Sequence, residues 1–127
     1  MTDAKPFPKS AQLARGERRY RRKIASPKQW QAIQAAKGAV CRLSNPGVCE
    51  SGVEYHHLVP RGAPWFGDDV ADNIVPLCRI HHGLITNRVP PALRRLGDSL
   101  TEGERAYMIE RGGEDYPERA YGIRYSR

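Results

Sequence analysis

One stretch near the start of the chain alternates apolar and polar residues with the period of a helix. Ser26 followed by Pro27 is typical of an N-cap with proline in the first turn. Trp30 and Ile33 then recur about one helical turn apart, and a glycine ends the run. The pattern predicts a helix over residues 27–37.

Two short apolar runs follow, and both are typical of strands. They cover residues 39–41 and 53–59 and are separated by turn residues that include Asn45-Pro46-Gly47. We therefore expect these runs to pair as a hairpin. Residues 60–73 are rich in proline, glycine and aspartate and predict a loop, after which an apolar run at 74–77 predicts a return to regular structure.

Two more helices are expected in the second half of the chain. One runs from Cys78 to about Ile85, because Pro90-Pro91 prevents it from continuing far. The other begins at Thr101, which forms a capping-box pattern with Glu104, and glycines end it at 112–113. The residues after position 113 carry no chemical signal.

The composition changes this picture by indicating that the fold needs a cross-link. The chain has 127 residues, of which 39% are hydrophobic, so its core is modest. Its three cysteines cannot all pair within the chain, and no apolar N-terminal segment suggests export to an oxidising compartment. We therefore expect a bound metal rather than disulfides. No run of about 18 apolar residues is present, so we expect no membrane span and a cytoplasmic setting, in a bacterial cell or in the host of an infecting phage.

The net charge of +7 is concentrated at the N-terminus. Residues 1–28 hold nine lysines and arginines against two acidic residues, and the remainder of the chain is balanced. Such a segment suits a nucleic-acid backbone, because neutralised phosphates release counterions. The alternative is a solvated, disordered tail. The densest part of the segment comprises Arg18, Arg19, Arg21, Arg22 and Lys23.

All the cysteines and histidines lie between positions 41 and 82, which indicates metal binding. Seven candidate ligands exceed what one tetrahedral zinc uses, so the economical interpretation is two sites. The first set consists of three cysteines and one histidine, and two residues separate its last cysteine from that histidine. A set in which the protein supplies all four ligands is typical of structural zinc. The alternative is that the thiols are small buried core residues. This first set comprises Cys41, Cys49, Cys78 and His81.

His56, His57 and His82 remain, and they suit an open catalytic site. Neighbouring residues of a strand point to opposite faces, so His56 and His57 are expected to do different work, one binding an ion and the other acting on a proton. A neutral imidazole can take a proton from water near neutral pH. The alternative is that the pair is structural.

The two segments Glu54-Tyr55-His56-His57-Leu58-Val59-Pro60-Arg61-Gly62 and Asp72-Asn73-Ile74-Val75-Pro76-Leu77-Cys78-Arg79-Ile80-His81-His82 resemble the HNH endonucleases. The resemblance spans about residues 41–86. It implies an α+β fold with a ββα-metal (His-Me finger) core at 39–88, inside a nuclease domain at 26–113, preceded by a basic flexible arm at 1–25 and followed by a C-terminal tail at 114–127.

The resemblance also implies a role for each motif residue. His57 takes the place of the general base, His56 and His82 those of the ligands to the catalytic ion, and Asn73 that of the asparagine that orients the hairpin loop. The four-ligand set takes the place of the structural zinc site. Three departures are that His81 replaces a more usual cysteine, that residues 42–48 are an insertion between the first two cysteines, and that Thr86 stands where some members have another histidine.

The expected activity is metal-dependent hydrolysis of DNA phosphodiester bonds, with low sequence specificity and a nick as the product, because one chain has one active site. The catalytic ion is expected to be Mg²⁺ or Mn²⁺, with Zn²⁺ or Ni²⁺ as alternatives. Arg61 either reaches a phosphate or is merely solvated. Expected partners are DNA and phage packaging or recombination proteins, with the chain a monomer or weak dimer. The alternatives are a non-catalytic zinc-stabilised DNA-binding module and a ββα-metal RNase.

Overall fold

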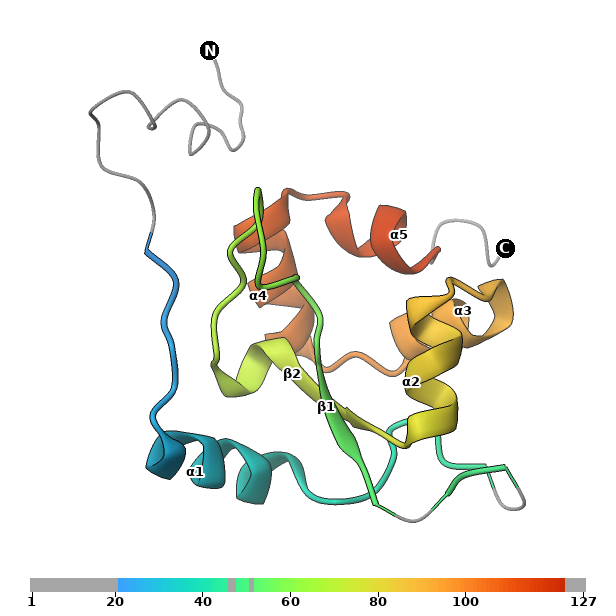
Figure 1. The fold of residues 1–127 in the computed structure, drawn as a ribbon. Coiled ribbons are helices and arrows are strands. Elements are labelled where there is room, and N and C mark those ends of the chain that lie inside the picture. Colours follow the sequence, from blue (N-terminus) through green and yellow to red (C-terminus); the bar gives the residue numbers. More distant parts are fainter. Residues whose placement is uncertain (1–20, 46–47, 51, 123–127) are drawn as a thin grey trace.

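The computed structural model describes residues 21–45, 48–50 and 52–122, which form a small α+β domain (Figure 1). Two short strands lie at its centre, and helices surround them: α1 below, α2 and α3 on one side, and α4 and α5 above and behind. No helix in the described ranges is long and apolar enough to cross a membrane. In chain order, the elements are α1 (Pro27–Lys37), β1 (Glu54–His57), the 3-10 turn η2 (Ala71–Asn73), β2 (Ile74–Leu77), α2 (Arg79–Thr86), α3 (Pro90–Asp98), α4 (Glu102–Gly112) and α5 (Tyr116–Tyr121).

The two strands form an antiparallel sheet in which Glu54 lies opposite Leu77 and His57 opposite Ile74. The predicted hairpin between residues 39–41 and 53–59 is therefore wrong. The apolar run at 39–41 is irregular, and the backbone N–H of Arg42 donates one hydrogen bond to Pro76 at 2.8 Å instead of continuing a ladder. An apolar run marks a candidate strand but does not specify its partner.

The helix starts predicted from local sequence are confirmed. Ser26 and Gln29 form a reciprocal capping box at the start of α1, and Thr101 and Glu104 form another at the start of α4. The predicted helix after Cys78 is present as α2, with Cys78 itself as the N-cap. The two capping boxes were reliable signals because each depends on residues only three positions apart.

The core lies between β2 and the helices of the second half of the chain. Every residue of β2 is buried, and Leu96 of α3 and Met108 of α4 are fully buried against the same cluster. The segment that the sequence assigns to a C-terminal tail contains α5, whose Tyr116 and Tyr121 are buried in this core. Aromatic side chains at the end of the chain thus close the domain.

The prolines at positions 90 and 91 start a helix as well as limit the previous one. Pro90 occupies the first turn of α3, where the missing N–H has no intrahelical acceptor and therefore costs little. The proline pair in the sequence indicates where the previous helix stops but does not by itself predict the new helix. The amphipathic α3 then places Leu93 and Leu96 in the core.

Candidate metal centre and histidine site

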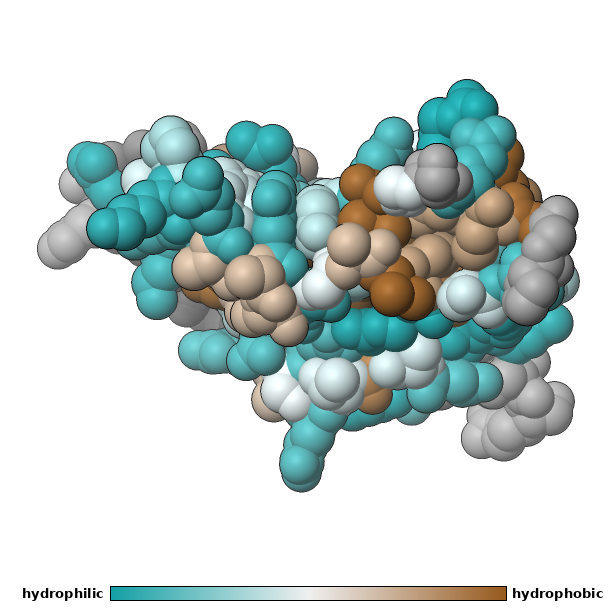
Figure 2. Space-filling view, turned by 90° about the horizontal axis from the view of Figure 1, so that it is seen from below, coloured by the Kyte–Doolittle hydropathy of each residue, from teal (hydrophilic) through white to brown (hydrophobic). Residues whose placement is uncertain are grey.

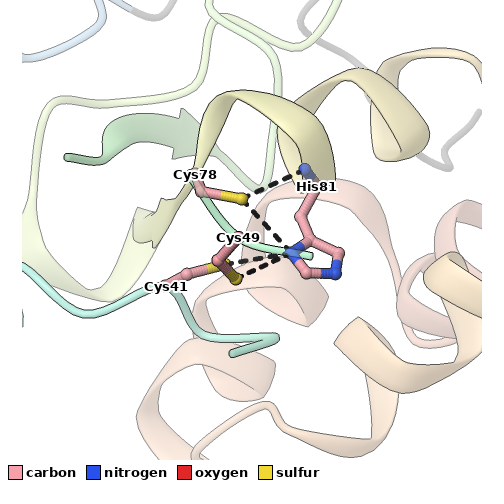
Figure 3. A group of neighbouring side chains, drawn as sticks. All are labelled: Cys41, Cys49, Cys78 and His81. Carbon is pink, nitrogen blue, oxygen red and sulfur yellow. Dashed lines mark hydrogen bonds between the residues drawn. The ribbon is translucent and has the colours of Figure 1, made fainter. Parts of the chain in front are cut away.

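Four predicted ligands converge beside the N-terminus of α2 (Figure 3). Cys41 and Cys49 come from the segment before β1, Cys78 caps α2, and His81 lies in the first turn of that helix. Their ligand atoms all lie within 4.8 Å of one another. Residues that are up to 40 positions apart in the chain are therefore brought to one point.

The distances within this cluster fit a tetrahedral ion. The three sulfur atoms lie 3.4, 3.3 and 3.3 Å from Nδ1 of His81, from Cys41, Cys49 and Cys78 respectively. A zinc with ordinary Zn–S and Zn–N bonds sets adjacent S and N ligands about 3.6 Å apart. All three cysteines are free thiols, and Cys41, Cys78 and His81 are buried. The four residues can therefore hold a metal such as zinc without rearrangement of the backbone.

The electrostatics of the cluster favour a thiolate at Cys78. Burial raises the pKa of this thiol, but the backbone N–H groups of His81 and Glu50, together with the side chains of Cys49 and His81, outweigh burial and lower the pKa to about 6. Burial raises the pKa of Cys41. One ligand is thus readily ionised before a cation is present, and a cation would favour ionisation of the others.

The surface beside the cluster is apolar. Figure 2, which views the molecule from below, shows hydrophobic residues gathered on one half of this face and hydrophilic residues on the other. Among the described residues, exposed large hydrophobic side chains include Val40, Val48 and Ile80, each of which directly adjoins a ligand in the sequence. An apolar rim suits a closed structural ion more than a site for a charged substrate.

His56 and His82 form a second group on the side of β1 that faces α2. Their ring centroids lie 5.2 Å apart, with the planes at 72°. Nε2 of His56 lies 3.1 Å from the hydroxyl of Tyr121, which itself donates to the carbonyl of Leu58. The Tyr121 oxygen therefore accepts the Nε2 proton of His56, which leaves Nδ1 of this ring with its lone pair.

His82 has a matching arrangement. Its Nδ1 lies 2.6 Å from a carboxylate oxygen of Glu54, the first residue of β1. A carboxylate only accepts, so Nδ1 is the protonated nitrogen and Nε2 keeps its lone pair. In the described part of the chain, no third cysteine, histidine or carboxylate joins His56 and His82 in a group of metal-ligand geometry like that of the four-ligand cluster.

Burial keeps His56 neutral. Removal from water, with smaller contributions from the positive charges of His82 and His57, lowers the pKa of this imidazole to about 3. A ring that resists protonation keeps its lone pair available to a cation throughout the physiological range.

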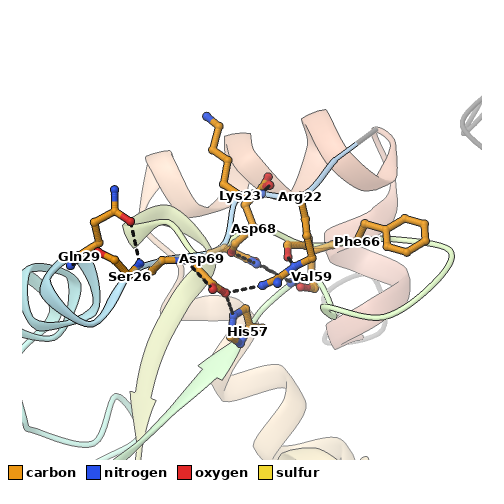
Figure 4. Close-up of polar contacts among 12 residues, drawn as sticks. Arg22, Lys23, Ser26, Gln29, His57, Val59, Phe66, Asp68 and Asp69 are labelled. Atoms are coloured by element: carbon orange, nitrogen blue, oxygen red, sulfur yellow. Dashed lines mark hydrogen bonds and ion pairs between the residues drawn. The ribbon is translucent and has the colours of Figure 1, made fainter. Parts of the chain in front are cut away.

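His57 points to the opposite face of β1, as strand alternation predicts. Its Nε2 lies 2.8 Å from Oδ1 of Asp69 (Figure 4). The ring of Trp30 in α1 packs against the His57 ring edge-on, at a centroid distance of 5.9 Å. Burial lowers the pKa of His57; Asp69 opposes this shift, whereas the nearby guanidinium groups of Arg61 and Arg22 add to it.

The end of the basic arm lies against this site. The sequence predicts a flexible arm up to residue 25, but Arg22 bonds Gly67 and Asp69 through its side chain, while the backbone N–H groups of Lys23 and Ala25 donate to Asp68 and Asp69. Gly67, Asp68 and Asp69 of the loop between the strands thus fix residues 22–25 by an ion pair and by hydrogen bonds.

The predicted phosphate-binding residues differ in their surroundings. Arg18 and Arg19 lie outside the described residues. Arg21, Lys23 and Arg61 are exposed. Arg22 is instead engaged with Asp69, and its side chain is only 14% exposed, so it is the least available of the described residues in this predicted set for a phosphate.

Asn73, the asparagine of the motif, holds the two ends of the loop between the strands. Its buried side chain accepts a hydrogen bond from the N–H of Val59 at 2.7 Å and donates to the carbonyls of Val59 and Asp68 at 3.1 and 2.9 Å. Asp69 is thereby set beside His57. Within the described residues, Asn73 makes no hydrogen bond to a histidine ring, and its hydrogen bonds instead hold the loop in place.

No family model, curated protein or solved structure matches the chain. The resemblance to HNH nucleases therefore rests on the motif residues of the sequence alone.

Sequence reasoning missed three residues of the histidine site. Asp69 lies in an acidic stretch without a distinctive spacing, Tyr121 lies in the segment taken for a tail, and Glu54 was only part of the motif. Glu54 had a usable signal, since a strand residue two positions before His56 shares its face. The other two meet the histidines only through tertiary structure.

Proposed function

We propose that this chain is a metal-dependent nuclease that hydrolyses phosphodiester bonds in DNA. The observation that carries the proposal is the orientation of His56 and His82. Oxygen acceptors on Tyr121 and Glu54 occupy one nitrogen of each ring, which leaves the other nitrogen free for a cation. Histidine ligands of metals usually have such an outer acceptor, which fixes the tautomer and raises ligand basicity.

The division of labour follows from the opposite faces of His56 and His57. His56 and His82 would hold the ion, and His57, at the end of β1, would take a proton from the attacking water. The ion would polarise the phosphate and offset charge on the leaving 3′ oxygen. The water oxygen bonds to phosphorus, its proton passes to His57, and the P–O3′ bond breaks, with solvent protonating the 3′ oxygen.

Two protein ligands leave the remaining positions of the ion to water and phosphate oxygens, as an open catalytic site requires. Imidazole ligands favour Ni²⁺ or Zn²⁺, whereas Mg²⁺ and Mn²⁺ prefer oxygen ligands. Mn²⁺ still accepts nitrogen ligands more readily than Mg²⁺, which would depend more on the substrate. We therefore expect activity with Mn²⁺ to equal or exceed activity with Mg²⁺.

The second metal site would be structural. A zinc held by Cys41, Cys49, Cys78 and His81 would join the segment before β1 to the start of α2, the helix that carries His82. All four positions are filled by protein, so this ion would stabilise the fold without contacting substrate.

Exposed cations would supply affinity for DNA. Arg21, Lys23 and Arg61 flank the loop that holds Asp69 beside His57. Contacts of this kind to phosphates carry no sequence information and weaken with salt, so binding would be largely non-specific.

The test is cleavage of supercoiled plasmid by the wild type and His57→Ala, each with Mg²⁺, Mn²⁺, Ni²⁺ or EDTA, after mass spectrometry shows equal zinc content. We expect metal-dependent nicking by the wild type and a loss of about 10²-fold or more in His57→Ala. Equal rates in the two proteins would remove His57 from the mechanism.

The rival function is a zinc-stabilised DNA-binding module without catalysis. In its favour, the only complete ligand set among the described residues is the four-residue cluster. Bound zinc and a DNA mobility shift without cutting by the wild type would establish the rival.

A further inference from the structure

Asp69 is the closest charged partner of His57. Its Oδ1 lies 2.8 Å from Nε2 of the ring, and its side chain is only 1% exposed, against 12% for that of His57. Asp69 follows the strand residue by 12 positions, across the loop that Asn73 closes. The contact is therefore made by the fold and not by neighbouring residues of one element.

The carboxylate of Asp69 cannot turn away from this contact, because other donors fix it (Figure 4). Arg22 donates to the same Oδ1 at 2.5 Å, and the backbone N–H of Ala25 donates to Oδ2 at 3.0 Å. In addition, the backbone N–H of Asp69 donates to the carbonyl of Lys23 at 2.8 Å. Four hydrogen bonds thus orient a buried group, and three of them involve residues 22–25.

These donors also keep Asp69 ionised. Burial raises the pKa of Asp69, but the N–H of Ala25, the His57 ring and the Arg22 guanidinium outweigh burial and hold the pKa below its usual value. An ionised carboxylate only accepts hydrogen bonds. The nitrogen of His57 that faces it must therefore carry the proton.

We propose that Asp69, held by residues 22–25, is the positioning residue of His57: it fixes the ring with Nε2 protonated and Nδ1 as the nitrogen that takes the proton from water. This inference rests on the proposed nuclease function. No described residue hydrogen-bonds Nδ1 of His57, and the ring of Trp30 packs against the His57 ring at a centroid distance of 5.9 Å. The arm would then complete the catalytic site as well as bind DNA.

The competing explanation is that Asp69 only anchors the arm to the domain. Both explanations predict that removal of the carboxylate lowers activity. They differ in whether the loss depends on His57, because a residue that acts through the ring has nothing to act on once the ring is gone.

The first experiment determines which nitrogen of the His57 ring is protonated. In the zinc-loaded wild-type protein at about pH 8, ¹⁵N NMR of labelled histidine reports which nitrogen of each ring is protonated. We expect His57 to show a protonated Nε2 whose proton is protected from solvent exchange, and Asp69→Asn to lose that protection. A His57 ring protonated at Nδ1, or an Nε2 proton equally protected in Asp69→Asn, would overturn the proposal.

The second experiment is kinetic and uses four variants: Asp69→Ala, the control Asp72→Ala, His57→Ala, and the double variant of Asp69 and His57. Asp72 is an exposed residue of the same loop. We expect Asp69→Ala to lower kcat by about 10²-fold with KM unchanged, Asp72→Ala to match the wild type, and the double variant to match His57→Ala.

If Asp69→Ala slows His57→Ala by the same factor as it slows the wild type, Asp69 is structural and the proposal fails. If the wild type cuts no DNA, the proposed function fails instead, while the NMR measurement still decides whether Asp69 fixes the ring. The two failures are therefore distinguishable.

Discussion

At the scale of single residues, the three histidines of the site differ in which ring nitrogen is occupied. The Tyr121 hydroxyl accepts a hydrogen bond from Nε2 of His56, and Glu54 accepts one from Nδ1 of His82. Asp69 accepts one from Nε2 of His57. Two acceptors lie on one face of β1 and the third on the other. Each ring thus keeps one nitrogen without a hydrogen-bond acceptor, and the identity of that nitrogen is set by a neighbour to which the sequence pattern assigned no role.

Glu54 offers a prediction at this scale. Glu54→Gln should weaken apparent affinity for the proposed catalytic ion by about 10- to 100-fold, because an amide is a poorer acceptor for Nδ1 of His82. The measurement is the nicking rate as a function of Mn²⁺ concentration. The matched control is Glu50→Gln, which removes a similarly exposed carboxylate from its pair with Arg79. The same Mn²⁺ dependence in both variants would contradict the role of Glu54.

At the scale of elements, the sequence predicted what is local. The starts of α1 and α4 were predictable because a capping box is complete within four residues. The four-ligand cluster was predictable because cysteine and histidine have few other reasons to gather. The pairing of β1 with β2 was not, because an apolar run carries no information about its partner across a long loop. Asp69 was missed for the same reason.

The loop between the strands gives a prediction about stability. Gly67 lies so close to Val59 that a Cβ at this position would meet the carbonyl oxygen of Val59 at 1.9 Å, whereas a Cβ at Gly62 would meet nothing within 4 Å. Gly67→Ala should therefore lower the free energy of unfolding by about 3 kcal/mol or more, since backbone must move, and Gly62→Ala should change it by about 0.5 kcal/mol or less. Urea denaturation measures both. Equal midpoints for the two variants would show that the loop is not held as described.

At the scale of the whole molecule, a buried ion-pair cluster links α4 to α1 and to the segment that carries Cys41. The fully buried Glu104 of α4 accepts from Lys37 at the end of α1 and from Arg42 beside Cys41. Burial raises the pKa of Glu104, but these two cations and the N–H of Thr101 outweigh burial and lower it to about 2. The first helix and the metal-binding segment are thereby fixed to the second half of the domain.

This cluster predicts how stability depends on pH. A glutamate whose pKa is lower in the folded state contributes stability above its unfolded pKa, and this contribution is lost as the pH falls from about 4.5 towards 2. Glu104→Gln keeps a capping side chain but removes the charge, so it should cost about 3 kcal/mol at neutral pH and little at pH 2. Thermal unfolding from pH 7 to pH 2 measures the difference, with the exposed Glu102→Gln as control. A constant difference between wild type and Glu104→Gln across this range would contradict the account.

We propose that this small chain carries two metal sites with different roles. One is a structural set on Cys41, Cys49, Cys78 and His81, and the other is a catalytic pair on His56 and His82. The most direct measurement is Mn²⁺ binding to zinc-loaded wild type and His82→Ala, followed by electron paramagnetic resonance of the free ion, with zinc per chain measured in parallel. The account predicts that the wild type binds one Mn²⁺ beyond its zinc, and that His82→Ala binds it at least about tenfold more weakly with its zinc retained. Equal Mn²⁺ binding by the two proteins, or loss of zinc together with Mn²⁺ in His82→Ala, would contradict it.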